Sequence, residues 1–370
     1  MKLIFWCCVL LITYAYIGYA GFLWLLVRIR PRPIYRAPII PNVTVIIAAH
    51  NEEANLPSKL ANVYSLAYPR DKLQIIIASD GSSDRTPQIL QENAPLILPV
   101  ILEKQNGKAC TLNAAVREAV GDILIFFDVR QSVDRDAISE LASCFSDPDI
   151  GAVSGELLLE TAPDLPNTDA LGIYWKIEKV VRKLESASGS VVGVTGAIYA
   201  MRRELYIDLP DSTILDDVLI PMNVARCGKR VVFLPSAIAR DRLYIQKGKE
   251  FSRKVRTLTG NYQLIRLAPW LISPDNPLFL RFISHKLLRL FVPILLLFML
   301  LASIATGGAF YHLASAAQLI FYTLACFGGL VPSSKRFKLI AVANTFVTLN
   351  AAALLAFYNF LSGKERVWVR

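Results

Sequence analysis

Acidic side chains follow hydrophobic runs at several points in the chain. Residues 122–128 read DILIFFD and end on Asp128, and residues 73–80 read LQIIIASD and end on Asp80. A carboxylate at the end of a buried strand is a common place to hold a metal ion, because Mg²⁺ and Mn²⁺ prefer oxygen ligands. Two positions after Asp128 stands Arg130, which cannot ligate a metal but can hydrogen-bond a phosphate. These residue types indicate a site for a metal ion, a phosphate group, or both.

One lysine stands where a helix is expected to begin. Lys108 ends the NGK loop and begins the stretch KACTLNAAVREAV, whose apolar residues recur at helical spacing. A cation next to a helix N-terminus is unfavourable unless an anion lies near it, because the helix dipole is positive there. Lys108 is therefore either a solvated lysine or the partner of an anion.

The elements that must position these residues alternate between strands and helices. Strands are expected at residues 43–50, 73–80, 98–104 and 122–128, and stretches of helical character separate them. This alternation predicts a mostly parallel sheet covered on both faces. Ligands in such folds bind beyond the carboxyl ends of the strands. The polar residues at those ends are His50, Asn51, Glu52, Asp80 and Asp128.

Two nucleotide-binding motifs, GxGxxG and GxxxxGK[ST], are absent from the sequence. A dinucleotide-binding fold and a P-loop ATPase therefore lose their main support. The six cysteines include no CxxC pair and no accompanying His cluster, which argues against a zinc site. We expect free thiols in a reducing compartment.

The composition favours a protein that works at a membrane. Mean hydropathy is +0.42, 54% of the residues are hydrophobic and the formal net charge is +10. Excess positive charge suits nucleic acid, an anionic membrane surface or a phosphorylated substrate, and the hydrophobicity favours the last two. Membrane lipids are therefore expected partners, and nucleic acid is not.

The N-terminus carries the first membrane signal. Residues 3–27 form an apolar run without a charge, long enough to cross a hydrocarbon core of about 30 Å. A signal peptide would have a shorter apolar region, of about 7–15 residues, and a small-residue cleavage site. Here arginines follow at once, which indicates a stop at a cytoplasmic face. They are Arg28, Arg30, Arg32 and Arg36.

Three more apolar stretches, at roughly 287–308, 310–331 and 339–361, predict further spans. The loop SSKRFK between the last two is basic, whereas TGGAFYH between the first two has no Lys, Arg, Asp or Glu. The positive-inside rule places SSKRFK and the middle of the chain in the cytoplasm. The basic tail GKERVWVR disagrees, because a four-span count puts it outside. Either the tail escapes the rule or one stretch is re-entrant.

Six motifs in one order carry a resemblance to a known family. They are AHNEE, ASDGSSD, NGKACTLN, FFDVRQ, GVTGAIYAMRR and ILDDVLIP. Over about residues 42–260 they resemble the family 2 glycosyltransferases with a GT-A fold. The flanking apolar segments are similar to those of membrane-bound bacterial members related to polysaccharide synthases. The resemblance implies an inverting sugar transfer from a nucleotide sugar, with a UDP-sugar as the expected donor.

The resemblance assigns the donor site residue by residue. It implies that Asn51, Glu52 and Asp80 contact the nucleoside, since a carboxylate can accept hydrogen bonds from uracil or ribose. The competing interpretation is that Asp80 only caps a turn in SDGSSD, while Asp84 caps the following helix. The resemblance also places the loop that carries Lys108 beside the nucleotide, where the ammonium can offset phosphate charge.

The motif FFDVRQ departs from the family pattern, which is DxD with a divalent cation bridging to the diphosphate. Asp128 fills the first acidic position and Arg130 fills the second. One aspartate can suffice when phosphates and water supply the other ligands, so the resemblance still implies Mg²⁺ or Mn²⁺ at Asp128. Arg130 is expected to bind the donor's phosphate or sugar, or alternatively to pair with Asp134 or Asp136.

The motif ILDDVLIP supplies acids for catalysis. By the resemblance Asp217 is the general base for the acceptor hydroxyl, opposite the departing diphosphate, so that attack inverts the anomeric centre. Asp216 would orient the acceptor or cap the next helix, and in the competing interpretation both acids only serve a helix N-terminus. Thr195 and Gly196, read as the end of another strand, are expected near the donor sugar or acceptor, because glycine permits close backbone approach.

Processive members of the family carry QxxRW near the membrane, and the corresponding stretch here is RKVRT. Arg253 replaces Gln, Arg256 is retained and Thr257 replaces Trp, which argues against processive translocation of a polymer. Arg256 is expected to bind the departing diphosphate. Alternatively, both arginines belong to an amphipathic helix that lies on anionic lipid.

The expected fold is an α/β, GT-A, Rossmann-like sheet flanked by membrane helices. We expect an N-terminal transmembrane helix over 1–30, a glycosyltransferase domain over 38–260, interfacial helices over 261–285 and about three transmembrane helices over 286–362. The expected function is transfer from a UDP-sugar to a lipid-linked or glycan acceptor at the cytoplasmic face of the inner (plasma) membrane. The alternatives are a processive polysaccharide synthase and an inactive sugar-nucleotide-binding subunit.

Overall fold

The computed structural model describes most of the chain. It covers residues 1–160, 169–242, 249–331, 334 and 337–364, and within these the side chains of 169–175, 242, 249 and 250 are not described. Several charges that entered the topology expectation lie outside the described residues, namely Lys335, Arg336, Arg366 and Arg370.

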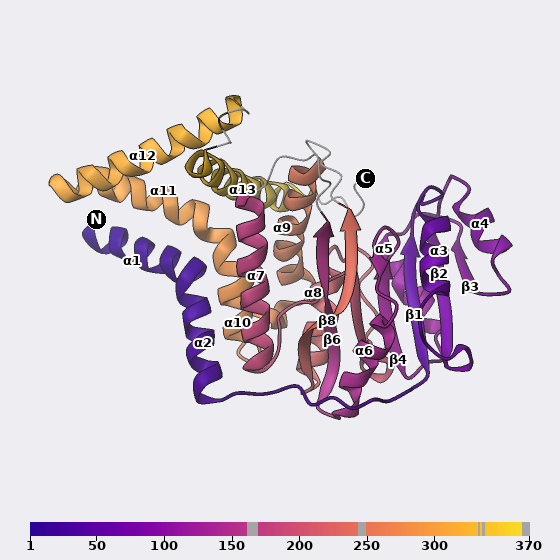
Figure 1. The fold of residues 1–370 in the computed structure, drawn as a ribbon. Helices are drawn as coiled ribbons and strands as arrows, with labels where there is room; N and C mark the ends of the chain where they lie inside the picture. Colours follow the sequence, from indigo (N-terminus) through magenta and orange to yellow (C-terminus); the bar gives the residue numbers. More distant parts are fainter. Residues whose placement is uncertain (161–168, 243–248, 332–333, 335–336, 365–370) are drawn as a thin grey trace.

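One sheet of eight strands forms the centre of the described residues (Figure 1). Its spatial order is β3-β2-β1-β4-β7-β6-β8-β5. The four strands expected from the sequence are present as β1 to β4. The bounds are β1 (Val43–Ala49), β2 (Leu73–Asp80), β3 (Leu98–Leu102), β4 (Ile123–Asp128), β5 (Ser132–Val133), β6 (Ile150–Glu160), β7 (Ile198–Arg202) and β8 (Arg230–Arg242).

The two halves of the sheet differ in strand direction. Strands β3, β2, β1 and β4 run parallel, as the alternation of strands and helices predicts. Beyond β4, strand β7 pairs antiparallel with both β4 and β6, while β8 runs parallel to β6 and antiparallel to β5. The sheet is therefore mixed as a whole, and its parallel half carries the acidic strand ends.

Helices cover both faces of this sheet. Side chains of β1 alternate between them: Val45 and Ile47 pack with α3, α4 and α6, and Ile46 packs with α5, α8 and α9. Burial on both faces explains why these strands read as continuous apolar runs. The helices are α3 (Leu56–Tyr64), α4 (Thr86–Glu92), α5 (Lys108–Arg117), α6 (Ala137–Ser143), α7 (Asp169–Ala187), α8 (Asp216–Arg226) and α9 (Lys249–Leu267).

Four helical segments among the described residues are long and apolar enough to cross a membrane. They gather at the end of the molecule opposite β1–β3, with α7 and α9 between them and the sheet (Figure 1). Their parts are α1 (Lys2–Thr13) with α2 (Tyr19–Ile29), α10 (Phe279–Phe282) with α11 (Leu288–Thr306), α12 (Ala309–Leu330) and α13 (Lys338–Leu361).

Two π-helical turns interrupt these segments where they meet. They are η1 (Tyr14–Gly18), between α1 and α2, and η6 (Ile283–Leu287), between α10 and α11. The Tyr14 and Ser284 hydroxyl oxygens, one from each turn, lie 2.9 Å apart. The sequence shows a single N-terminal apolar run, but the helix bends at η1 (Figure 1), and buried Tyr19 packs α2 against α7. A π turn is a common cause of such a bend.

The region expected to hold interfacial helices is continuous with its neighbours. Helix α9 runs unbroken through residue 260, so the expected domain limit falls inside a helix. After the 3₁₀ turn η5 (Pro269–Ile272), a helical segment begins at Phe279 and continues through the π turn η6 to Thr306, so the expected limit at residue 285 falls inside it. The three prolines that suggested an interruption all precede Phe279, which is why the helix can start there.

Candidate active site

The carboxyl ends of β1, β2 and β4 lie side by side. Ala48 of β1 is in register with Ala78 of β2 and with Asp128 of β4, so the residues just beyond these strands share one edge of the sheet. The His50 Nδ1 atom lies 2.7 Å from the Asp80 carbonyl oxygen across this edge. The polar strand ends therefore converge as the sequence predicts.

Asn51 and Glu52 hold the loops at this edge. Asn51 has a φ of 53°, a left-handed conformation that asparagine tolerates, and its Oδ1 accepts a hydrogen bond from the Ser83 amide at 2.7 Å. Glu52 Oε2 accepts a hydrogen bond from Asn55 Nδ2 at 2.6 Å. Both residues are partly exposed, and their contact with a nucleoside stays a prediction.

Asp80 is fully buried, and its two carboxylate oxygens accept backbone hydrogen bonds from Asn106 at 2.7 Å and Gly107 at 2.9 Å. It therefore fixes the loop before α5, and it does not cap a turn within SDGSSD. Capping of α4 falls to Asp84, whose Oδ1 accepts from the Thr86 amide at 2.9 Å. In this arrangement Asp80 offers no exposed surface to a nucleoside, so that contact requires the loop to move.

Lys108, the first residue of α5, bridges two carboxylates. Its Nζ lies 3.3 Å from Asp128 Oδ1 and 3.1 Å from Asp216 Oδ2. Burial lowers the pKa of Lys108, but the carboxylates of Asp128, Asp216 and Asp217 raise it, and the net shift is upward. The anions that a cation at a helix N-terminus requires are therefore supplied by the protein itself. Lys108 is not a free solvated lysine.

Asp217 lies beside this bridge, in the first turn of α8. Burial, with a further contribution from Asp216, raises the pKa of its carboxyl group to about 6, against the opposing effect of Lys108 and other cations. A carboxylate with a pKa near the working pH suits a general base. The backbone of Gly196 passes close by, since a Cβ at that position would lie 3.7 Å from Asp217 Oδ2.

Thr195 forms part of a buried hydrogen-bond network. Its Oγ1 accepts from Arg182 at 2.6 Å, and its amide donates to Ser154 Oγ at 2.9 Å. Thr195 and Gly196 precede β7, whereas the sequence was interpreted as a strand ending there; the strand comprises the apolar residues that follow this loop. The loop brings Gly196 to the carboxyl group of Asp217.

A cavity of about 630 Å³ opens between these elements. Ligand sites in proteins commonly measure about 300–1,000 Å³. The predicted residues in its wall are Lys108, Asp128, Thr195, Gly196, Asp216, Asp217 and Arg256, and Thr257 lies beside Arg256. Asn51, Glu52, Asp80 and Arg130 do not line it. The structure thus brings the acids of FFDVRQ and ILDDVLIP and Arg256 of α9 to one cavity.

Arg130 lies outside the cavity wall and binds β8. Its guanidinium lies 2.5 Å from the carboxylate of Asp241, which is buried and also accepts from Gln131 Nε2 at 2.9 Å. The alternative partners expected from the sequence, Asp134 or Asp136, were wrong: Arg130 pairs with Asp241, and Asp134 pairs with Arg240 at 2.8 Å. Arg130 therefore holds the loop after β4 against β8. This position does not support the expected contact with phosphate or sugar.

We expect Arg130→Ala to lower the melting temperature by about 2–4 °C and to leave the donor KM within about twofold. The reason is that Asp241 loses one of its partners, which costs about 1 kcal/mol, while the cavity wall stays intact. Thermal unfolding and donor titration measure the two effects, with Arg240→Ala, which removes an ion pair of β8 outside the cavity wall, as a matched control. A tenfold rise in KM at unchanged stability would return Arg130 to the donor site.

The oxygen ligands that the protein offers can hold a metal ion only if a bound substrate supplies further ligands. Within the described ranges, no group of three or more His, Cys, Asp and Glu side chains could hold a metal. Asp128, with its side chain 40% exposed, is a single carboxylate in the cavity wall. It fits Mg²⁺ or Mn²⁺ if a diphosphate and water supply the remaining oxygen ligands.

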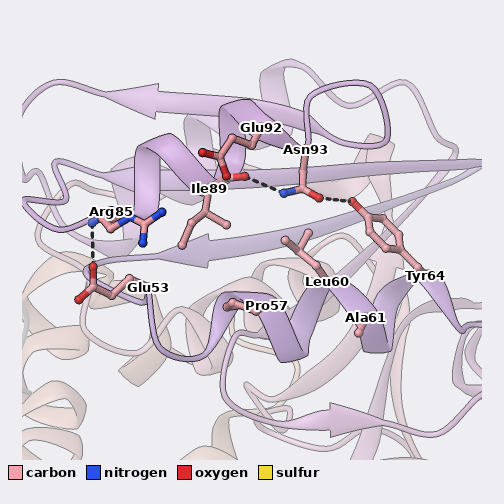
Figure 2. A pocket seen from close by; sticks show the side chains of 9 residues that line it. All are labelled: Glu53, Pro57, Leu60, Ala61, Tyr64, Arg85, Ile89, Glu92 and Asn93. Atoms are coloured by element: carbon pink, nitrogen blue, oxygen red, sulfur yellow. Dashed lines mark hydrogen bonds between the residues drawn. The ribbon is translucent and has the colours of Figure 1, made fainter.

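A second cavity, of about 720 Å³, lies between α3 and α4 (Figure 2). Hydrogen bonds at the ends of the two helices flank it: before the helices, Glu53 accepts from the Arg85 amide at 3.0 Å, and at their other ends Tyr64 donates to Asn93 at 3.4 Å. None of the site residues predicted from the sequence lines it. We therefore assign the chemistry to the cavity that contains Asp217.

Sequence reasoning missed the contribution of α7 to the site. Glu178, Lys179 and Arg182 line the cavity, and Lys179 forms an ion pair with buried Glu156. The usable signal was the spacing of Glu178 and Arg182, four residues apart on one helix, where their side chains lie 3.6 Å apart. That spacing alone could not show that the pair faces a cavity.

Comparisons with known proteins show what the chain is similar to. Residues 44–209 match the family model described as Glycosyl transferase family 2. The probable glycosyltransferase YdaM of Bacillus subtilis (strain 168) is 28% identical over 248 residues, which cover 62% of this chain and 58% of that protein. The poly-beta-1,6-N-acetyl-D-glucosamine synthase of Staphylococcus aureus (strain COL) is 24% identical over 241 residues, covering 63% and 58%. The chain thus spans 58% of the length of these curated relatives.

A solved structure extends the likeness over nearly the whole chain. The mannosyltransferase PcManGT from Pyrobaculum calidifontis, in complex with GDP-Man and Mn²⁺, has a TM-score of 0.71 and 25% identity, covering 98% of this chain and 100% of that one. The fold is that of the GT-A class of glycosyltransferases. The match of residues 44–209 to glycosyl transferase family 2 confirms the resemblance seen in the motifs.

Proposed function

We propose that this chain is a membrane-anchored inverting glycosyltransferase that moves a sugar from a UDP-sugar to a lipid-linked or glycan acceptor, in polysaccharide or glycolipid biosynthesis. The observation that carries the proposal is the arrangement around Lys108. One ammonium joins Asp128, at the end of β4, to Asp216, at the start of α8, and Asp217 lies beside them in the same cavity. The residues proposed to act on the diphosphate thus lie next to the proposed base, Asp217.

In the proposed reaction Asp217 accepts the proton of the acceptor hydroxyl. The hydroxyl oxygen bonds to the anomeric carbon of the donor sugar as the bond from that carbon to the diphosphate breaks. Lys108 and Arg256 offset the charge that develops on the departing diphosphate. Asp128 would hold Mg²⁺ or Mn²⁺, which when bound supplies further positive charge for the same phosphates. Asp216 keeps Lys108 in place through their ion pair of 3.1 Å.

The donor base is the finer part of this proposal. The family resemblance favours UDP, whereas the PcManGT complex holds GDP-Man, so GDP-mannose is the second candidate. A screen of UDP- and GDP-sugars for release of free nucleotide by purified protein tests both. We expect one donor to be turned over at least tenfold faster than the rest, and a chain that releases nucleotide from none of them is a binding subunit.

A lipid-linked acceptor is supported by the walls of the cavity. Leu157, Leu159 and Phe233 give it an apolar side, and α7 and α9, which line it, also pack against α13. Transfer of a single sugar is favoured over processive synthesis because Thr257 stands where the processive motif has Trp. The Staphylococcus aureus synthase is the relative that keeps polymer synthesis as the second candidate. Product length on a lipid acceptor separates the two.

The proposed topology puts the sheet domain in the cytoplasm at the inner membrane. Arginines that follow α2 support it, and Arg36 binds Glu140 of α6 at 2.9 Å, which joins this basic segment to the sheet domain. Reporter fusions after residue 160 and residue 309 are expected to give opposite signals. Equal signals from the two fusions would overturn the topology, and a fusion after residue 42 serves as the cytoplasmic reference.

A further inference from the structure

A set of buried polar contacts, here called the α7 latch, fixes the start of the second long apolar segment, α10 with α11, onto α7. His285 lies between two carboxylates, with Nδ1 2.9 Å from Glu185 and Nε2 3.0 Å from Glu178. Arg289 donates to Glu178 at 3.0 Å, and Arg281 donates to the Glu185 carbonyl oxygen at 2.7 Å. Arg281, His285 and Arg289 recur every four residues, so the latch fixes the rotation of this helix about its axis.

The latch determines where the next residue, Lys286, lies. A Cβ at Gly193 would lie 3.6 Å from Lys286 Nζ and 3.4 Å from the carbonyl oxygen of Asp217. The ammonium therefore lies next to the first turn of α8, although it comes from η6, at the start of a membrane helix. Lys286 is half-buried, and within the described part of the chain its ammonium has neither a hydrogen bond nor an ion pair.

The other charged groups that face Asp217 are already engaged. Lys108 is shared between Asp128 and Asp216, and Arg182 binds Thr195 at 2.6 Å and lies 3.6 Å from Glu178. Burial and Asp216 raise the pKa of the Asp217 carboxyl, and Lys108, Lys286 and Arg182 oppose that rise. Lys286 is thus a cation near the base that forms no ion pair among the described residues, although the carboxylates of Glu178 and Glu185 also attract its charge.

We propose that Lys286 is a positioning residue of the sugar transfer, held by the α7 latch, that keeps the Asp217 carboxylate charged for proton abstraction. The inference rests on the proposed function, because it assigns Lys286 an effect on the proposed base. It makes the first turns of a membrane helix part of the catalytic apparatus. A base whose charge depends on that helix is fully active only when the helix is seated on α7.

The first test is the pH dependence of kcat in the full-length protein in detergent or lipid. Lys286→Gln is expected to move the acidic limb of the profile upward by about half to one pH unit, since removal of a nearby positive charge favours the neutral carboxyl. Lys286→Arg is expected to restore the limb to the wild-type position. Lys183→Gln, which removes an exposed charge from α7, is the matched control. An unmoved limb in Lys286→Gln overturns the proposal.

A second test needs no activity. The difference in melting temperature between each parent and its Asp217→Asn derivative reports the titration of Asp217, measured from pH 4 to pH 8 in the wild-type and Lys286→Gln backgrounds. The midpoint of that difference is expected to rise in the glutamine background by the same half to one unit. Equal midpoints in the two backgrounds would contradict the role of Lys286 even if no donor is turned over. Failure of this inference can therefore be told apart from failure of the proposed function. Lys286→Met is the second neutral variant if Lys286→Gln does not fold.

Discussion

Replacing Asp217 with asparagine is expected to abolish sugar transfer while donor binding stays nearly intact. The amide keeps the shape of the side chain but cannot accept the proton of the acceptor hydroxyl, and loss of a general base costs about 10²–10⁴-fold in rate. Calorimetry with the nucleotide and a transfer assay measure the two effects. Asp211→Asn, which neutralises an exposed carboxylate six positions earlier, is the control. Activity above about half of the wild-type level would remove Asp217 from this role.

The raised pKa of Asp217 adds a signature in pH. Because the carboxyl group has a pKa of about 6 in the folded protein and 3.8 as its reference value, kcat should rise as the pH passes through about 6. The same shift favours the folded state below pH 3.8, and that contribution is lost as the pH rises through 6. Asp217→Asn should therefore melt higher than wild type at pH 7.5, by a margin that shrinks towards pH 4.

Removal of the metal is the second large effect we expect. EDTA should stop the reaction and Mn²⁺ or Mg²⁺ should restore it, because the charge that develops on the departing diphosphate otherwise lacks compensation. Asp128→Ala should lose nearly all turnover and all metal dependence. The same change removes one of the two ion pairs of Lys108 and leaves the pair with Asp216. The variant must therefore keep a normal melting temperature, so that the loss of rate is not a loss of folding.

The matched control is Asp134→Ala, which removes an acid that pairs with Arg240 and does not line the cavity. It should keep its metal dependence. Binding of Mn²⁺ should be measurable in wild type only when nucleotide is present, since Asp128 is the one protein ligand expected in the described part of the chain. Full activity in EDTA would defeat the metal hypothesis, and charge compensation would then fall to Lys108 and Arg256.

The sequence predicts the parallel half of the sheet well for a physical reason. Strands buried on both faces must be apolar throughout, so β1, β2 and β4 appear as β-branched runs with sharp polar ends. A strand was expected near β7, but β6 and β8, and the pairing of all three strands, were not predicted because this pairing joins distant segments. Ile150 is in register with Arg230 and Ile198 with Phe127, and no local pattern encodes these partners.

The same distinction separates the site residues that were predicted from those that were not. Asp128, Asp216 and Asp217 follow recognisable local motifs, and the convergence of strand ends brings Lys108 to them. The contact between Glu178 and His285 spans 107 positions, so only the folded chain reveals it. The available hint was the presence of His285 and Arg289 at the start of an apolar helix, where ionisable residues are costly and mark function.

The α7 latch also makes the sheet domain and the membrane helices a single folding unit. Glu185 is completely buried, and its carboxylate is bonded by Tyr19 of α2, at 2.6 Å, and by His285 of η6. Both partners come from segments long and apolar enough to cross a membrane, one from each end of the chain. A fragment restricted to residues 38–260 would lack both partners and would expose to water the face of α7 that carries Glu185. We therefore expect the N-terminal and C-terminal apolar helices to be in place before the sheet domain reaches its final stability.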